Sequence, residues 1–136
     1  MNRSVFDSMT SEQQLWYAKA VISMIMADER VDQSEVEYLE SLFRLFKNTP
    51  HLAQLQTWHK AGKKIEIETN LTFSPSLVTE VLKNCMSIAI SDAEFHSNEL
   101  KALQHIGKCL GASAQEVDSI VQWGTSRLAH IFAFAS

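Results

Sequence analysis

Acidic residues gather in two short stretches of the sequence, and their carboxylates are the groups best placed to do chemistry. The first stretch, MADERVDQSE at 26–35, holds four acids and one base directly after the apolar run AVISMIMA. The second, SDAEFHSNEL at 91–100, also follows an apolar run. Carboxylates suit a hard divalent ion, and an imidazole shifts the preference towards a transition metal. The candidate metal ligands are Asp28, Asp32, Glu35, Asp92, Glu94, His96 and Glu99.

An EF-hand loop is the obvious comparison, and the first stretch does not fit it. With Asp28 at position one, Arg30 stands at position three, where an oxygen ligand is needed. Gln33 takes the place of the glycine, and Leu39 takes the place of the bidentate glutamate at position twelve. The second stretch fails at the same glycine and glutamate positions. A metal site would therefore need carboxylates from both stretches.

Helix capping explains some of these acids without a metal. Asp32 and Glu35 have the spacing of an N-cap residue and its partner three positions on, each of which binds a backbone N–H. Asp28 and Asp92 instead fall at the C-terminal ends of expected helices, where the helix dipole disfavours an anion by about 0.3–1 kcal/mol. A bound cation or a local Asx-type turn would compensate for that cost. Solvated acids at capped corners and a shared metal site are the two interpretations.

The two stretches form an internal repeat. A shift of 64 positions lays SDAEFHSNELKAL over ADERVDQSEVEYL, so that Asp28 meets Asp92, Asp32 meets His96 and Glu35 meets Glu99. Each copy follows an apolar helix and opens an amphipathic one. The repeat, about 11–47 and 75–111, predicts two helical hairpins that pack about a pseudo-two-fold axis.

The elements that carry these turns are predicted to be helices. Two prolines and four glycines interrupt the chain, and most apolar residues recur at three- and four-residue spacing, which indicates an all-α protein. A capping box of Ser11 with Gln14 opens the first helix, and another of Ser113 with Glu116 opens the last. The stretch KKIEIETNLTF favours an extended connection over a strand. The expected helices are 11–28, 33–47, a short one from Leu52 that stops at Gly62, 75–91, 97–110, and one from Ser113 towards a terminal IFAFAS that docks on the core.

Length and composition limit the classes of function. At 136 residues the chain fits one domain that can bury roughly two-thirds of its unfolded surface. A net charge of -4 is too small to indicate a nucleic-acid binder. With neither an apolar span nor a signal-peptide pattern, we expect a cytoplasmic protein without membrane insertion. The cysteines, Cys85 and Cys109, are expected to be reduced core thiols.

Motifs of common enzymes are absent from the sequence. It contains no GxSxG, no GxxxxGK[ST] and no HExxH. The other histidines are expected to be ordinary surface or core residues; they are His51, His59, His105 and His130. The three tryptophans, Trp16, Trp58 and Trp123, are expected to anchor the core.

The paired turns resemble those of the TerB-like family, named for the tellurite-resistance protein TerB. The matching segments are SMIMADERVDQSEVEYLESLF and SIAISDAEFHSNELKALQHIGKCLGAS, and the likeness covers most of residues 11–125. The resemblance implies a single compact domain over 1–136, an all-α bundle of about seven helices with an acidic surface formed by the two turns. It also implies stress responses, membrane-associated complexes and no enzymatic activity. The family's turn commonly reads Asp-Gly, whereas Glu29 and Ala93 follow the aspartates here, which weakens any metal role carried over from the family.

Two functions follow as expectations. The first is a non-enzymatic interaction module that holds a protein partner through its acidic turns or its apolar C-terminal tail, with a membrane-associated complex among the expected partners. The second is a divalent-metal sensor or buffer in which both turns share one ion. No other cofactor is expected.

Overall fold

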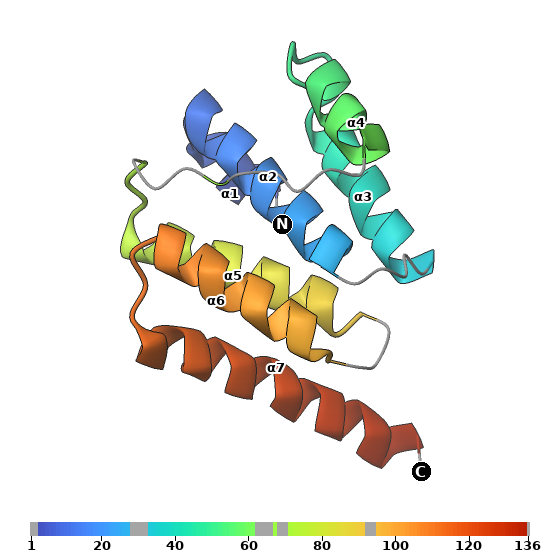
Figure 1. Ribbon diagram of the computed structural model, residues 1–136, viewed down its shortest axis with the longest axis vertical. Helices are drawn as coiled ribbons and strands as arrows, with labels where there is room; N and C mark the ends of the chain where they lie inside the picture. Colours follow the sequence, from blue (N-terminus) through green and yellow to red (C-terminus); the bar gives the residue numbers. More distant parts are fainter. Residues whose placement is uncertain (1–2, 28–32, 62–66, 68–70, 92–94, 136) are drawn as a thin grey trace.

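The computed structural model describes residues 3–27, 33–61, 67, 71–91 and 95–135. For residues 33–35, 61 and 128–135 it describes the backbone alone. Seven helices and no strand lie within these ranges, which confirms the predicted all-α class (Figure 1). The helices are α1 (Arg3–Ser8), α2 (Ser11–Ala27), α3 (Gln33–Leu45), α4 (Leu52–Ala61), α5 (Pro75–Ala89), α6 (Ser97–Cys109) and α7 (Ala114–Ala135).

The helices begin and end close to the capping and helix-breaking residues of the sequence. Ser74 caps α5 with its side chain, which accepts a hydrogen bond from the Leu77 N–H, and Pro75 follows in the first turn. Gly111, at φ 76°, provides the left-handed residue that ends α6. Residues 67 and 71–74 are neither helix nor strand, as predicted for the connection, whereas Gly62 lies outside the described residues.

The N-terminal part of the chain differs from prediction in two respects. The capping box of α2 is one residue earlier than Ser11 and Gln14: the Gln13 side chain accepts from the Thr10 N–H at 2.9 Å, and the Thr10 hydroxyl accepts from the Gln13 N–H at 3.1 Å. Gln14 instead donates its side-chain amide to the Phe6 carbonyl at 2.9 Å. The other difference is α1, a six-residue helix that the sequence pattern does not indicate.

The central helix of the bundle is α2. It contacts α3, α4, α5 and α6, and Figure 1 shows it between the α3–α4 pair and the α5–α6 pair. Residues at consecutive positions, Ala20, Val21 and Ile22, are all buried, so its second half is enclosed on several faces. The apolar run before the first acidic stretch therefore forms the central helix, as an apolar composition on all faces of a helix indicates.

Two hairpins, α2–α3 and α5–α6, form most of the bundle. They pack through contacts of α2 with α5 and α6 and of α3 with α5. Each hairpin thus contributes a face that the other buries, as the repeat predicts. The exact pseudo-two-fold relation stays a prediction.

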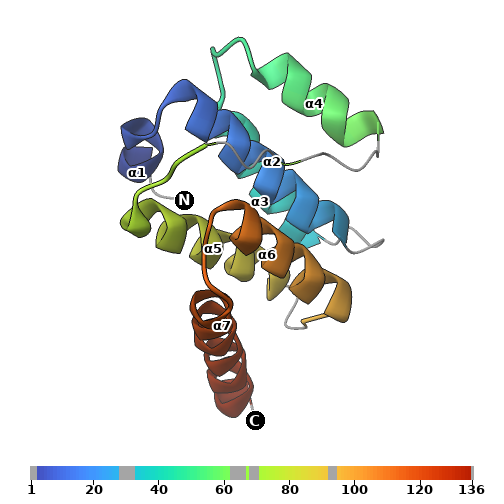
Figure 2. The ribbon, with the colours of Figure 1, turned by 60° about the vertical axis from the view of Figure 1, so that its left-hand side comes forward.

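The long helix α7 packs on α5 and α6 with its N-terminal half, and the Ser113–Glu116 capping box opens it as predicted. Two glycines permit its close approach: a Cβ on Gly107 of α6 would overlap Val117, and one on Gly124 of α7 would overlap Met86 of α5. In Figure 2 the C-terminal end of α7 extends beyond the other helices. The prediction that IFAFAS docks on the core falls on side chains outside the described part.

Both cysteines, Cys85 and Cys109, are free and buried, as predicted.

Candidate functional site

The helix ends that flank the two acidic stretches lie on the same side of the molecule. α2 ends and α3 begins there, and α5 ends and α6 begins there too (Figures 1 and 2). Asp28, Asp32, Asp92 and Glu94 lie outside the described residues, as does the side chain of Glu35. A metal ion shared by these carboxylates therefore stays a prediction.

Glu99 is the predicted ligand whose surroundings the structure defines best. It is 3% exposed, and its Oε1 accepts a hydrogen bond of 3.1 Å from the backbone N–H of His96, the residue before α6. This bond satisfies one of the amides that a helix start leaves unpaired. The His96 side chain is exposed. At this turn the capping interpretation therefore accounts for Glu99. Within the described residues, no group of three or more histidine, cysteine or carboxylate side chains is placed to hold a metal ion.

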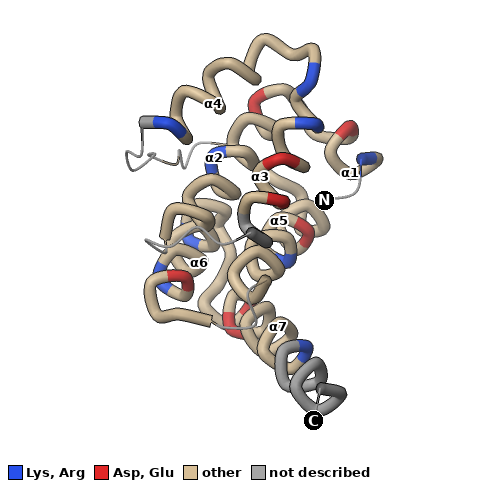
Figure 3. The backbone as a smooth tube through the Cα atoms, turned by 90° about the vertical axis from the view of Figure 1, so that its right-hand side faces the viewer, with Lys and Arg blue, Asp and Glu red and all other residues tan. Residues whose placement is uncertain are grey.

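Acidic and basic residues occur together on the described helices α1 and α3. Figure 3 shows basic and acidic residues interspersed over α1 and α3. Arg3 and Asp7 form an ion pair of 3.3 Å within α1. The predicted acidic surface consists of the two stretches at 28–35 and 92–99, whose acidic side chains other than that of Glu99 fall outside the described part.

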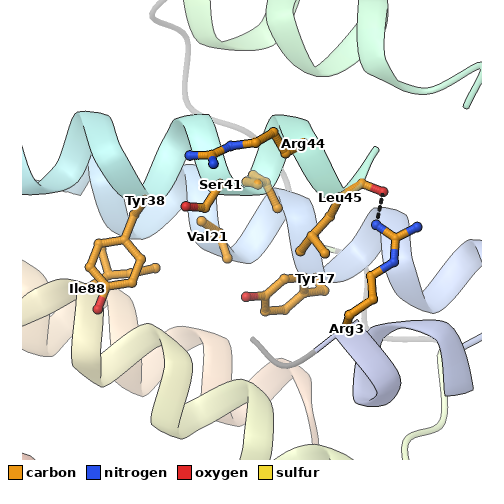
Figure 4. Close-up of a pocket in the computed structure, with 9 residues that line it drawn as sticks. Arg3, Tyr17, Val21, Tyr38, Ser41, Arg44, Leu45 and Ile88 are labelled. Atoms are coloured by element: carbon orange, nitrogen blue, oxygen red, sulfur yellow. Dashed lines mark hydrogen bonds between the residues drawn. The ribbon is translucent and has the colours of Figure 1, made fainter. Parts of the chain in front are cut away.

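A cavity of about 230 Å³ lies where α1, α2, α3 and α5 meet (Figure 4). Three hydroxyl groups line it, from Tyr17 of α2 and from Tyr38 and Ser41 of α3. Two arginines line it as well, Arg3 from α1 and Arg44 from α3. The rest of the wall is apolar and comprises Val21, Leu42, Leu45 and Ile88. The cavity thus combines donors and positive charge with an apolar wall.

Tyr17 forms the deepest polar part of this cavity. Its side chain is 4% exposed, and its hydroxyl points from α2 towards Tyr38 and Ile88 (Figure 4). Burial, followed by the proximity of Cys85 and Tyr38, raises the pKa of Tyr17 well above its ordinary value, so the phenol stays protonated at neutral pH. None of the described residues forms a hydrogen bond with this hydroxyl.

The two arginines differ in their interaction partners. Arg3 pairs with Asp7, and its Nη1 donates to the carbonyl of Leu45 at 3.4 Å, where α3 ends. That bond ties α1 to the negative end of the α3 dipole. Arg44 makes a long backbone contact, Nε to the Glu40 carbonyl at 3.5 Å, and no carboxylate of the described residues pairs with it.

The sequence contained a signal for this cavity. Tyr38, Ser41 and Arg44 recur every three residues, so they share one face of α3 beside its apolar stripe. Tyr17 and Val21 are four residues apart on α2 and share a face in the same way. What the sequence could not indicate is that these two faces meet α1 and α5 around an unfilled space.

His105 is exposed, as expected of a surface histidine. It lies one helical turn before Cys109, and its Nε2 is 3.7 Å from the Cys109 Sγ. Burial raises the pKa of the Cys109 thiol, although Lys108 partly opposes this shift. The pair therefore holds a protonated thiol beside an imidazole, which is not the thiolate that nucleophilic catalysis needs.

The tryptophans are buried to different extents. Trp16 is 2% exposed and packs against Phe73 with ring centroids 5.1 Å apart, which confirms its place in the core. Trp58 and Trp123 are half-buried and lie under cations: Lys19 at 5.4 Å from the Trp58 ring, and Lys83 at 5.3 Å and Arg127 at 4.8 Å from the Trp123 ring. For these two, cation–π packing accompanies partial burial.

Comparison with known proteins identifies the family. None of the helices in the described residues has the length and apolar content of a membrane span. Neither the curated proteins nor the solved structures contain a match to this chain. The family model of the tellurite resistance protein TerB matches residues 14–122, which is most of the chain and includes both acidic turns and all of the two hairpins except the first residues of α2. The chain therefore belongs to the TerB family.

Proposed function

We propose that this TerB-family domain is a non-enzymatic interaction module that holds a protein partner through the two acidic turns, in a stress response of the tellurite-resistance type. The observation that carries this proposal is the position of the turns. The ends of α2 and α5 and the starts of α3 and α6 lie on one side of the bundle, so both acidic stretches can contact one partner (Figures 1 and 2).

The structural setting of the turns supports binding rather than catalysis. Glu99 is engaged in capping α6, so it is not poised as a general acid or base. His96, which corresponds to Asp32 in the repeat, is exposed beside it. A group of acidic residues at a turn between helices suits electrostatic recognition of a basic surface, which contributes chiefly to association rate and specificity.

The proposal is tested with the full chain as bait in a lysate of its source organism. The test variant is Asp28→Asn with Asp92→Asn. The matched control is Glu37→Gln with Glu40→Gln, which removes the same number of charges from the exposed face of α3. We expect a basic partner that the wild type and the control retain and that the turn variant loses.

The partner identified in this way is then purified and its affinity is measured at two salt concentrations. Binding through the turns should weaken as salt rises, because exposed charges are screened. If the turn variant binds every retained protein as tightly as the control does, the turns are not the interaction surface and the proposal fails.

A further inference from the structure

We propose that the cavity between α1, α2, α3 and α5 binds a small organic oxyanion, a carboxylate or a phosphate monoester. Arg44 faces the charge of this ligand, and the hydroxyls of Tyr17, Tyr38 and Ser41 donate hydrogen bonds to its oxygens. This function is separate from the acidic turns, because none of the nine residues that line the cavity is acidic.

The hydroxyl groups in the cavity can donate hydrogen bonds to a ligand. Tyr17 is 4% exposed as a residue, and its hydroxyl lines the cavity. No described residue accepts a hydrogen bond from this hydroxyl, so it is available to donate to a ligand in the cavity. The protonated phenol is a donor at neutral pH, and it points along the cavity towards Tyr38, whose hydroxyl is the second donor (Figure 4). A ligand with several acceptor oxygens satisfies both.

The charge in the cavity selects an anion. Arg3 is neutralised by Asp7 at 3.3 Å, whereas Arg44 pairs with no carboxylate of the described residues. A guanidinium presents a planar fork of N–H donors that matches a carboxylate or a phosphate. Ser41, one turn before Arg44, lies beside this guanidinium in Figure 4 and adds a donor on the same side. A metal cation is disfavoured at this place because two arginines and no acid line the wall.

The apolar residues beside the donors indicate that the anion is part of an organic molecule. Val21 and Ile88, from α2 and α5, present aliphatic side chains to the same space, and Leu42 and Leu45 of α3 extend that surface. At about 230 Å³ the cavity is below the roughly 300–1,000 Å³ of sites that hold drug-sized ligands. The ligand is therefore small, with one apolar group beside its oxyanion.

The probes for the test are benzoate and phenyl phosphate, titrated into the full chain and followed by backbone amide chemical shifts. Benzyl alcohol has a similar ring without the charge, and inorganic phosphate has the charge without the ring. We expect saturable binding of benzoate or phenyl phosphate, with shift changes confined to α1, α2, α3 and the C-terminal end of α5. Binding of benzoate alone identifies a carboxylate ligand, and binding of phenyl phosphate alone identifies a phosphate ester.

Two variants assign the binding to the proposed groups. Arg44→Gln should weaken the binding about tenfold or more, because a hydrogen bond to a charged group is lost. Tyr17→Phe keeps the buried ring and removes only the hydroxyl, so it should weaken binding while the domain stays folded. The matched control is Arg127→Gln on α7, which does not line the cavity and should leave the affinity unchanged.

Three results would overturn the inference. One is that neither benzoate nor phenyl phosphate binds saturably at millimolar concentration. Another is that benzyl alcohol or inorganic phosphate binds as tightly as the organic anions. Tight binding of benzyl alcohol would show that the charge does not contribute to affinity, and tight binding of inorganic phosphate would show that the apolar wall does not. The last is that Arg44→Gln and Tyr17→Phe, both folded, bind with the affinity of the wild type.

Discussion

Gly107 of α6 faces Val117 of α7 at a spacing that leaves no room for a methyl group between them. Leu82 of α5 lies 3.8 Å from the same position, so three helices converge there. Farther along α7, Gly124 meets Met86 of α5 with the same lack of space. Two glycines thus set the distance at which α7 packs on the hairpin α5–α6.

Gly107→Ala should destabilise the domain. The alanine gains up to about 1 kcal/mol of helix propensity, but its methyl group overlaps Val117, whose branched side chain has little rotamer freedom in a helix. Overpacking of a core costs typically about 1–3 kcal/mol, so the net loss should be about 1 kcal/mol. Urea unfolding followed by far-UV circular dichroism measures it.

The double variant Gly107→Ala with Val117→Ala is the control for this first prediction. It removes the group that clashes, so the two changes should show a favourable coupling energy when compared with the single variants. If Gly107→Ala proves as stable as the wild type or more stable, α7 can move away at no cost and the close approach has no role in stability.

Gly124→Ala should cost less than Gly107→Ala. The group it meets is Met86, an unbranched side chain with three rotatable bonds that can adopt another rotamer. Met86 is fully buried, so some loss remains after it moves. The same urea experiment ranks the two variants, and the reverse order would mean that Met86 is held more rigidly than Val117.

The stability of the domain should fall at alkaline pH because of Cys85. Burial raises the pKa of this thiol from its ordinary value of 9.0 to about 12. Above pH 9 the unfolded chain loses a proton that the folded chain retains, so stability is complete below pH 9 and is lost as pH rises towards 12. The expected slope is about 1 kcal/mol per pH unit, measured as the unfolding free energy in urea between pH 8 and about 11.

Cys85→Ala tests the origin of this slope. The variant is less stable at every pH because it leaves a cavity, but its stability should change less between pH 9 and 10. Tyr17, whose pKa is also raised, adds a second loss above pH 10 that Cys85→Ala does not remove. An unchanged slope between pH 9 and 10 in the variant would assign the effect to other groups.

The helices α2 to α7 could be predicted because each of them has a strong local signal. α5 has Ser74 and Pro75 at its start, α6 has Gly111 after its end, and the apolar residues between keep the helical period. The start of α2 agrees with the prediction, but its capping box lies one residue earlier than predicted. Thr10 and Ser11 are both good caps, and the sequence does not show which of them Gln13 or Gln14 reaches. α1 was missed because six residues are too few to show a period.

The candidate sites were predictable only where one segment carries the interaction. The cap formed by Glu99 follows from a three-residue spacing, which is local to α6. The cavity around Tyr17 instead requires side chains from four helices, and its existence depends on their not filling the space between them. No pattern along one segment contains that information.

Glu99→Ala should lower the stability of the domain by about 1 kcal/mol, because the His96 N–H loses its acceptor at the start of α6. Glu99→Gln keeps a side-chain oxygen at the same place and should cost less. Thermal unfolding in the presence of a chelator measures both changes without any contribution from a metal. If Glu99→Ala is as stable as the wild type under these conditions, capping does not explain why this acid is buried.

Addition of a divalent ion should decide between solvated acids and a shared metal site at the two turns. The measurement is the thermal unfolding midpoint of chelator-treated protein, alone and with calcium, magnesium, manganese or zinc near millimolar concentration. An ion at about a hundred times its dissociation constant adds about 2.7 kcal/mol, which moves the midpoint of a domain of this size by several degrees. The metal interpretation predicts a shift that Asp28→Asn with Asp92→Asn abolishes and that Glu37→Gln with Glu40→Gln, on the exposed face of α3, leaves intact. With no ion present, the turn variant should be more stable than the wild type if the aspartates repel each other and the helix dipoles, because both charges are removed from helix C-terminal ends. A midpoint that no ion moves would leave the capping of α6 by Glu99 and electrostatic contact with a partner as the roles of these acids.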